Sequence, residues 1–451
     1  MNTAAWQPPR TAPEPGVAPL NSKDKPLQCG NDADMADPAP SKPLRVLVSE
    51  GNSTSAREAI TVLGLAGHHI EVCDPSRFGL ARFSRFVRKW RGCPGLRDDP
   101  AGFLSFVETL LAARHFDVLL PIHEQGFLFA RVLPRLQDRV GLALPSFESY
   151  RTAHSKAGFS RLLHRLGLPQ PATRIVTSAS ELRDAVQFPC LVKTSVGTAS
   201  RGVRLLRNDG DLERSLRDLD ASGAFADEVL VQDFVNGITE KAQGVFCRGE
   251  LLGFHAYRQI AAGAGGGEAI KRSVIRPQLR AQLAKIGHTL AWHGALSVDC
   301  VVPDNGAPPL LVDCNPRLVE PMSGYLAGVD LVALLLRVSQ GEAPAVAPES
   351  RAGVRTHLAM QALLGCALRG GRRRDILREC GRLLRGEAPY AGSTEELTPI
   401  GVDWISAVPL AMIALSLLLV PRWANDLAKR GWGAHLLDIA GIRRIESEDF
   451  R

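Results

Sequence analysis

The chain has 451 residues, of which 45% are apolar and 22% charged, and its formal net charge is +7. This length has room for two or three packed domains and excludes a small scaffold held by disulfides. The positive charge is spread along the chain, which argues against a nucleic-acid binder but leaves anionic small molecules as candidate ligands. The nine cysteines include no CxxC pair, a pattern typical of reduced thiols in the cytoplasm rather than of a disulfide framework or a zinc site.

The first 43 residues are crowded with proline and contain no apolar run. Such a segment buries too little surface to offset the entropy lost on ordering, so residues 1–43 are expected to form a disordered leader. The missing apolar stretch also argues against a secretory signal.

Short apolar strands and helical stretches alternate from Leu44 onward. The expected strands are 45–48, 69–73 and 116–121, and the expected helices are 56–65 and 103–114. This order predicts a parallel sheet, so residues 44–150 are expected to form a Rossmann-like α/β domain. No GxGxxG marks a dinucleotide site. Ser53, Thr54 and Ser55 follow the first strand, where turn and capping roles are commoner than ligand contact.

The pattern changes at about residue 151. Phe159, Leu162, Leu163 and Leu166 fall on one helix face, and Gly167 follows the last of them. Short strands separated by turns are then expected at 188–193, 203–206, 229–232, 244–246 and 251–254. This succession predicts an α+β region with an antiparallel sheet.

Two lysines and a glycine-rich loop indicate a phosphate-binding site. Lys193 ends an apolar strand, and the loop Gly197–Gly202 follows it directly. Glycines let backbone amides approach an anion, and the ammonium group supplies the countercharge. Lys156, near the start of a helix, would add a second cation. An ordinary surface hairpin has a similar composition, and no Walker A sequence is present.

Three oxygen-bearing side chains mark a hairpin later in the chain. Asp299 lies in a strand at 297–302, and Asp313 and Asn315 lie in a strand at 310–315. Strand alternation points all three to one face. Two carboxylates and an amide suit a Mg²⁺ ion that also takes phosphate oxygens. The alternative is an edge hairpin with solvated carboxylates.

Two further elements accompany the hairpin and the loop. Arg317 follows the second strand, where its guanidinium group would grip a phosphoryl or carboxylate oxygen, unless it forms a surface ion pair with Glu320. The segment Val231–Val235 resembles a strand that passes into a connector and offers backbone groups to an adenine edge.

In their order, these pieces resemble the ATP-grasp superfamily. The likeness rests on FPCLVKTSVGTASRGV, VLVQDFVNG and VDCVV…LLVDCNPR followed by AGVDL. It is closest to the ATP-binding domains of the carbamoyl-phosphate synthetase large chain and biotin carboxylase and to predicted ATP-grasp carboligases. The resemblance covers about residues 44–345. It implies a pre-ATP-grasp domain over 44–150, an ATP-grasp catalytic domain over 151–345 and a mostly helical C-terminal region over 346–451.

The resemblance also implies residue roles. The phosphates of ATP would lie against Lys156, Lys193, Gly197, Ser200 and Gly202. The adenine and ribose would contact Gln232, Asp233, Val235 and Glu240, and Mg²⁺, or Mn²⁺ in its place, would bind Asp299, Asp313 and Asn315. Lys193 and Arg317 would act in catalysis.

The implied activity is that of a ligase that uses ATP to activate a small-molecule carboxylate as an acyl phosphate, which a nucleophile such as an amine then attacks. Three departures leave alternatives open. Asp313 stands where glutamate is common, Glu240 reaches the ribose position only after a one-residue slip, and no biotin-carrier segment is present. A non-catalytic ATP-binding or sensing module and a membrane-associated scaffold are therefore alternatives.

The C-terminal region contains seven arginines and two acids between residues 369 and 385, which suits either a solvated helix face or anionic headgroups. Residues 404–420 form the longest apolar run, bracketed by Trp404 and Trp423. The run is near the lower limit for a membrane span, and Pro409 would kink it. A cytoplasmic protein attached to the inner face of a membrane and a buried core helix are both open readings.

Overall fold

The computed structural model describes residues 42–197, 202–430 and 435–450. The predicted leader therefore lies almost wholly outside the described residues. Residues 44–451 form one unit and residues 1–43 another, so the domain boundaries near 150 and 345 remain predictions.

A parallel four-stranded sheet begins the described chain, with strand order β3-β2-β1-β4. Its strands are β1 (Arg45–Val48), β2 (His69–Asp74), β3 (Val87–Gly92) and β4 (Val118–Leu120), and its first helices are α1 (Thr54–Leu65) and α2 (Pro100–Ala113). Both helices begin at a capping residue, because the Ser53 hydroxyl accepts from Ala56 N and the Asp99 carboxylate accepts from Gly102 N. Only β3 was not predicted, because this edge strand is polar and largely exposed.

An antiparallel four-stranded sheet with its own small core follows. It is preceded by α3 (Gln125–Arg131), α4 (Leu133–Gln137), α5 (Phe147–His154) and α6 (Lys156–Leu166). The sheet runs β5 (Thr173–Val176), β8 (Val229–Asp233), β6 (Cys190–Thr194), β7 (Val203–Leu206), with α7 (Ala179–Ala185) and α8 (Asp209–Ala221). The strands agree with the antiparallel arrangement that the sequence predicts for this region.

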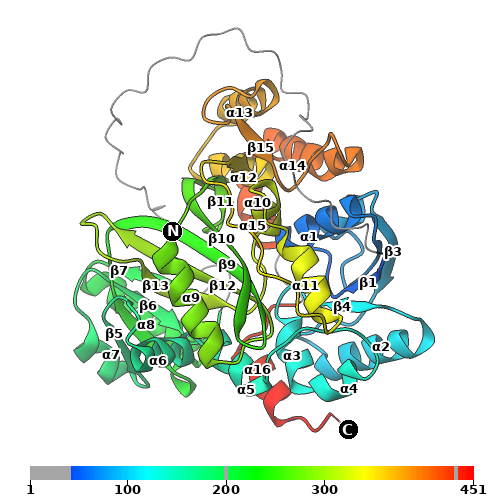
Figure 1. Ribbon diagram of the computed structural model, residues 1–451. Helices are drawn as coiled ribbons and strands as arrows, with labels where there is room; N and C mark the ends of the chain where they lie inside the picture. Colours follow the sequence, from blue (N-terminus) through cyan, green and yellow to red (C-terminus); the bar gives the residue numbers. More distant parts are fainter. Residues whose placement is uncertain (1–41, 198–201, 431–434, 451) are drawn as a thin grey trace. The chain divides into compact units, whose positions relative to one another are not determined.

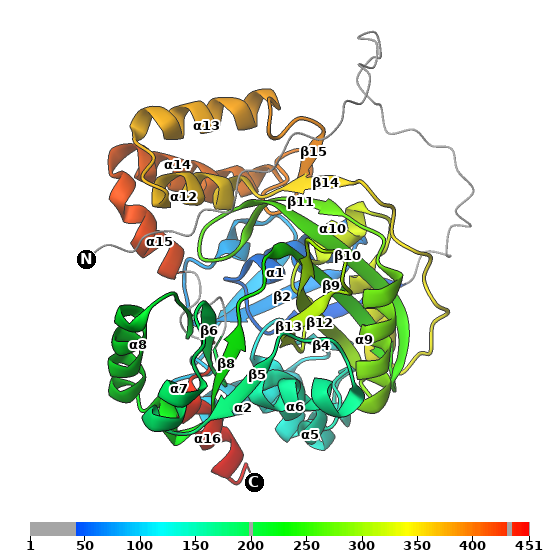
Figure 2. The same ribbon diagram turned by 90° about the vertical axis from the view of Figure 1, so that its left-hand side faces the viewer.

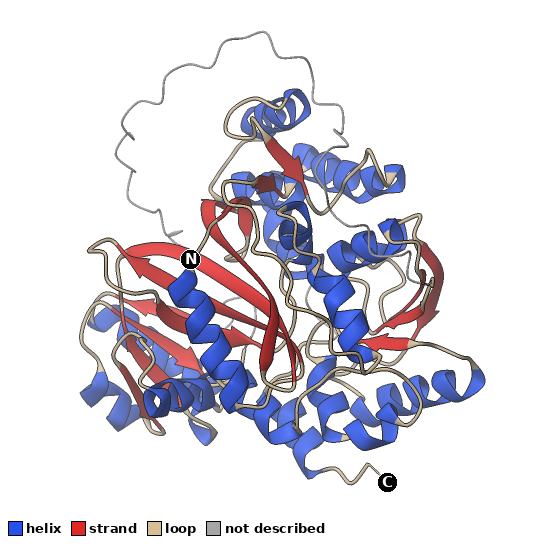
Figure 3. Ribbon diagram, viewed as in Figure 1, coloured by secondary structure: helices blue, strands red, loops and turns tan. Residues whose placement is uncertain are grey.

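A seven-stranded sheet occupies the middle of the described structure (Figure 3). Its order is β13 (Leu310–Asn315), β12 (Gly294–Pro303), β9 (Gly237–Cys247), β10 (Glu250–Ala262), β11 (Glu268–Ser273), β14 (Arg355–His357), β15 (Ser393–Glu395). Helix α9 (Pro277–Thr289) covers one face of β9 and β10, where Leu283 meets Gly244 (Figure 1). The side chains of Lys241 and Gln243 alternate with those that face α9, so they point to the opposite face.

The C-terminal region contains two short strands besides its helices. Strands β14 and β15 extend the seven-stranded sheet, and three-residue strands are too short to show a periodicity in sequence. The region also returns to the first sheet: Arg57 of α1 and Asp403 form an ion pair of 2.7 Å with both side chains fully buried. Helix α16 (Ile439–Ser447) places Ile445 in the same core as Phe103.

Three elements link the sheets and the C-terminal helices: α10 (Pro321–Leu326), α11 (Leu331–Ser339) and α12 (Ala359–Leu368). The arginine-rich segment is α13 (Arg373–Arg385), and α15 (Ala424–Arg430) follows the apolar run. That run forms a short 3-10 turn, Trp404–Ser406, and then α14 (Ala407–Leu419). The sequence predicted a kink at Pro409. This residue instead lies in the first turn of α14, where proline is tolerated without a kink. Within the described part of the chain, no helix has both the length and the apolar character that crossing a membrane requires.

Candidate nucleotide and metal site

The hairpin of β12 and β13 brings the three predicted metal ligands to one face. Asp299 lies opposite Asp313 in the strand register, and Ser297 lies opposite Asn315. The Oδ1 atom of Asp299 is buried without a hydrogen-bond partner among the described residues. Burial raises the pKa of Asp299, and Lys241 on the neighbouring strand opposes that rise. A carboxylate oxygen left unpaired in this setting needs a cation or a proton.

Lys156 reaches this hairpin from the start of α6. The helix is capped by Ser155, whose hydroxyl accepts from Gly158 N. The Lys156 Nζ donates to Gly197 O at 2.9 Å and to Asp313 Oδ1 at 3.1 Å. The contact joins the predicted phosphate loop to a predicted metal ligand.

Lys193 approaches the same hairpin from β6. Its Nζ donates to Gln232 Oε1 at 2.7 Å and to Val312 O at 3.0 Å, and the residue is 5% exposed. Burial lowers the pKa of Lys193 to about 8, although the nearby Asp313 carboxylate favours its charged form. Lys156 of α6 and Lys193 of β6 therefore both reach β13 of the seven-stranded sheet.

The loop between β6 and β7 is described only at its ends. The Gly197 carbonyl accepts from Lys156, as given above, and Gly202 has φ +81° and pairs its carbonyl with Thr194 N. A Cβ at Gly202 would lie 2.2 Å from Thr194 Oγ1, so a side chain there meets both strain and crowding. Ser200 lies outside the described residues.

The predicted adenine hinge is placed only in part. Gln232 is buried and uses its amide to hold Lys193 and, through Nε2, Thr173 Oγ1 at 3.0 Å. Asp233, at the end of β8, is exposed, and Val235 is partly buried in the connector that follows. In this structure Gln232 thus accepts a hydrogen bond from Lys193 and positions it. Its contact with adenine remains a prediction.

The structure does not bring Glu240 to the site. Its carboxylate is fully buried and binds Arg276 at 2.7 Å and Arg258 at 3.0 Å. Glu240 neighbours Lys241, which lies opposite Asp299, so strand alternation turns Glu240 to the α9 face of the sheet. These contacts do not place Glu240 beside the three hairpin ligands, and its contact with the ribose remains a prediction.

Arg317 lies beside the hairpin in a small pocket. Among the described residues its guanidinium group makes only long hydrogen bonds, to Asn315 Oδ1 and Leu318 O at 3.4 Å and to Ser55 Oγ at 3.5 Å. The surface ion pair with Glu320 is not formed. The pocket is lined by His123, Glu124, Tyr150, His154, Lys156, Gly197 and the segment 314–317. Burial lowers the pKa of His154 to about 4, so that imidazole is neutral near pH 7.

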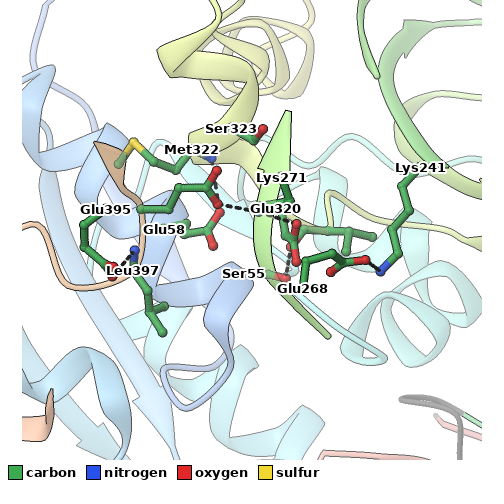
Figure 4. Close-up of polar contacts among 12 residues, drawn as sticks. Ser55, Glu58, Lys241, Glu268, Lys271, Glu320, Met322, Ser323, Glu395 and Leu397 are labelled. Atoms are coloured by element: carbon green, nitrogen blue, oxygen red, sulfur yellow. Dashed lines mark hydrogen bonds and ion pairs between the residues drawn. The ribbon is translucent and has the colours of Figure 1, made fainter. Parts of the chain in front are cut away.

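A second polar cluster on the same face of the sheet was not predicted (Figure 4). Lys271 is fully buried and forms ion pairs with Glu320 and Glu396, while Lys241 pairs with Glu268 at 2.8 Å. Glu58 of α1 accepts from Met322 N at 3.2 Å and lies in the same group. Burial would raise the pKa of Glu320, but the Lys271 and Lys241 ammonium groups outweigh it and lower that pKa to about 2. We name these six side chains the Lys271 cluster.

No local signal in the sequence could have revealed the Lys271 cluster. Its members come from α1, β9, β11, the segment after β13 and the segment after β15. In contrast, the three predicted metal ligands lie within one hairpin. The described residues hold no group of three or more His, Cys, Asp or Glu side chains arranged for a metal ion.

Comparison with known sequences gives partial matches. No family model matches the chain. It is 28% identical over 252 residues to the carbamoyl phosphate synthase large chain of Rubrobacter xylanophilus, which covers 52% of this chain and 23% of that protein. The Thermus thermophilus carbamoyl phosphate synthase large chain is 25% identical over 210 residues. This match covers 44% of this chain and 20% of that protein. The chain thus spans about a quarter or less of the length of these relatives.

Solved structures match more of the chain. The biotin carboxylase domain of Hydrogenobacter thermophilus 2-oxoglutarate carboxylase, crystallised with MgADP and bicarbonate, has a TM-score of 0.56 at 16% identity, covering 70% of this chain and 74% of that chain. An ADP complex of N5-carboxyaminoimidazole ribonucleotide synthetase has a TM-score of 0.56 at 15% identity. The match covers 82% of this chain and 97% of that chain. The chain has the ATP-grasp fold. Together with the sequence likeness to carbamoyl phosphate synthase large chains, these structures support the ATP-grasp superfamily inferred above from short motifs.

Proposed function

We propose that this ATP-grasp chain is an ATP- and Mg²⁺-dependent carboxylate ligase. It transfers the γ-phosphoryl group of ATP to a small-molecule carboxylate, and a nitrogen nucleophile then attacks the acyl carbon and releases phosphate. The sequence likeness to carbamoyl phosphate synthase large chains and the fold shared with biotin carboxylase and N5-carboxyaminoimidazole ribonucleotide synthetase support this class.

One observation carries the proposal. Lys156 and Lys193, from two different elements, reach the strand that bears Asp313 and Asn315, with Lys156 Nζ 3.1 Å from Asp313 Oδ1 and Lys193 Nζ 3.0 Å from Val312 O. Lysines gathered beside carboxylates suit a metal–triphosphate, whose phosphates would take the cations and whose metal would take the carboxylates.

The residues fit a divalent cation. Asp299 contributes a buried oxygen without a partner among the described residues, and Asp313 and Asn315 add oxygens from the same face. These are hard ligands of the kind that Mg²⁺ prefers, and Mg²⁺ normally completes its shell with phosphate oxygens and water. When bound, the ion would neutralise charge on the phosphates.

The protein's own side chains would then position the reacting groups and neutralise their negative charge. Lys193, held by Gln232, supplies a fixed positive charge beside β13. Arg317 is buried, makes only long hydrogen bonds, and so has donors left for a phosphoryl or carboxylate oxygen in the adjoining pocket. Positioning and charge neutralisation are the main contributions that a protein makes to phosphoryl transfer.

The test is phosphate release from ATP in the presence of pooled carboxylates and amines, followed by deconvolution of the active pair. We expect release that depends on both pools and on Mg²⁺ and that falls strongly in Lys193→Ala and Asn315→Ala. Lys89→Ala, which removes an exposed lysine of β3, is the matched control. Release that is unchanged in the Lys193→Ala/Asn315→Ala double variant would refute the proposal, and tight ATP binding without turnover on any pool would favour an ATP-sensing module instead.

A further inference from the structure

Helix α14 and its flanking turns expose a line of large apolar side chains, which we call the α14 stripe. The exposed fractions are Trp404 68%, Val408 39%, Met412 57%, Leu415 59%, Leu419 55% and Trp423 47%. Successive members are three or four residues apart, so within the helix they share one face. Isolated exposed apolar residues are ordinary, whereas a continuous line of six marks a contact surface.

The opposite side of α14 is already used. Leu417 is fully buried, and Leu410, Ile413 and Ala414 pack in the same cluster as Leu363 and Leu364 of α12. The helix is therefore apolar on both its inner and its outer face, although it lies at the surface. A helix of this kind is normally covered on all sides, so the inner packing leaves the α14 stripe in need of a partner.

Uncompensated arginines lie beside the α14 stripe. Helices α13 and α14 lie side by side (Figures 1 and 2). A side-chain nitrogen of Arg373 donates to the Leu419 carbonyl at 2.6 Å, which places the cationic start of α13 at one end of the stripe. Arg372, Arg374 and Arg422 are exposed and form no ion pair within the described residues.

The charges of these arginines decide between two partners for the α14 stripe, a second copy of the chain and an anionic membrane surface. If a second copy covered the α14 stripe with its own in parallel, the unpaired arginines of both copies would lie close together, and like charges across an interface oppose binding. In an antiparallel pair, the arginines of each copy would lie near the Trp404 end of the other stripe, which offers them no run of acidic side chains. An anionic membrane surface offers acyl chains to the apolar side chains and negative headgroups to the arginines. Tryptophans at both ends of a segment also suit the headgroup region.

We propose that α14 binds in the plane of an anionic membrane surface, with the α14 stripe among the acyl chains and the start of α13 and Arg422 at the headgroups. This attachment needs no membrane-crossing helix, and it depends on none of the residues of the proposed ligase site. Binding is expected to be reversible and to weaken as salt screens the arginines.

The test uses the full chain and sedimentation with phosphatidylcholine vesicles that contain or lack phosphatidylglycerol. We expect pelleting with the anionic vesicles and a blue shift of tryptophan emission. Met412→Ser/Leu415→Ser should lower the partition coefficient by roughly tenfold or more, since two buried apolar side chains are lost. Arg372→Ala/Arg374→Ala should weaken binding to anionic vesicles only. Phe78→Ser/Ile275→Ser, which alters exposed apolar residues elsewhere, is the control and should bind normally.

Three results would overturn the proposal. They are no pelleting with either vesicle, equal pelleting with neutral vesicles, and binding that Met412→Ser/Leu415→Ser leaves unchanged. A concentration-dependent dimer in analytical ultracentrifugation without lipid, abolished by the same double variant, would assign the α14 stripe to a second copy. All substituted side chains are exposed, so an unchanged melting temperature will show that the variants are folded.

Discussion

Two polar clusters lie on one face of the seven-stranded sheet and differ in how their charges are balanced. At the hairpin end, Asp299 has an oxygen without a partner and Arg317 makes only long contacts. At the other end, Lys271 is fully buried between Glu320 and Glu396. Lys241 stands between them, opposite Asp299 in the register and paired with Glu268.

This difference supports the proposed binding site at the hairpin end and indicates a structural ion network around Lys271. In the Lys271 cluster both lysines are held in ion pairs by glutamates from elements far apart in the chain, and so the cluster holds α1, the sheet and the segment after β15 together. At the hairpin end Lys156 pairs with Asp313, but an Asp299 oxygen has no partner and Arg317 makes only long hydrogen bonds among the described residues, which leaves room for contacts with a ligand. The following variants test this difference.

The largest expected effect is on stability in Lys271→Met. Removing the ammonium group leaves Glu320 and Glu396 buried without their cation, and loss of one partner of a buried pair costs about 3–5 kcal/mol. Urea unfolding monitored by circular dichroism measures this cost, with Lys89→Met as the exposed control. A loss below about 1 kcal/mol would mean that Lys271 does not hold Glu320 and Glu396 as described.

Lys193→Met should change activity far more than stability. Its ammonium group is buried with one amide and one carbonyl as partners, so its loss should change unfolding free energy by only about 1 kcal/mol. Substrate-dependent phosphate release should fall by roughly 10²–10³-fold, as when one preorganised donor to a transition state is removed. Full activity with reduced stability would reverse the assignment of the two clusters.

The affinity for ATP should depend on pH through Lys193. Burial lowers the pKa of this lysine to about 8, so it loses its positive charge as pH rises through that value. Since the charged form binds phosphate, the Kd for MgATP should rise several-fold between about pH 7 and pH 9. Lys193→Arg keeps its charge over this range, so calorimetric titration of that variant should show a flatter profile.

The smallest effect is expected from Glu58→Gln. Burial raises the pKa of Glu58 well above its usual value, with the Glu396 charge adding to the rise, so the group is protonated in the folded state where the unfolded chain is ionised. Its contribution to stability is therefore complete below about pH 4.5 and is lost as pH rises towards the folded pKa. Glutamine mimics the protonated form, so stability should change by less than about 1 kcal/mol at low pH and decline less steeply above it. An unaltered pH profile of the unfolding midpoint would contradict this state of Glu58.

The hairpin end could be predicted because its chemistry is local. Asp299, Asp313 and Asn315 lie within one hairpin, and strand alternation alone places them on a common face. Lys156 and Lys193 were recognised through motifs, and the contacts with β13 appear only when α6 and the two sheets are assembled.

The remaining features depend on long-range packing. The partner of Glu320 is Lys271, 49 residues away, rather than the nearby Arg317. Glu240 is turned away because its neighbour Lys241 faces Asp299, a relation that the strand register determines. Strands β14 and β15 gain their conformation from pairing at the sheet edge, and their three residues show no period of their own.

The central claim is that the hairpin end holds a metal nucleotide against Lys156 and Lys193. Calorimetric titration of ATP into the full chain with and without Mg²⁺, repeated with Asp299→Asn/Asp313→Asn, tests it most directly. We expect one site per chain whose affinity is raised by Mg²⁺ in the wild type and is insensitive to Mg²⁺ in the double variant. Equal Mg²⁺ dependence in both proteins would contradict the claim.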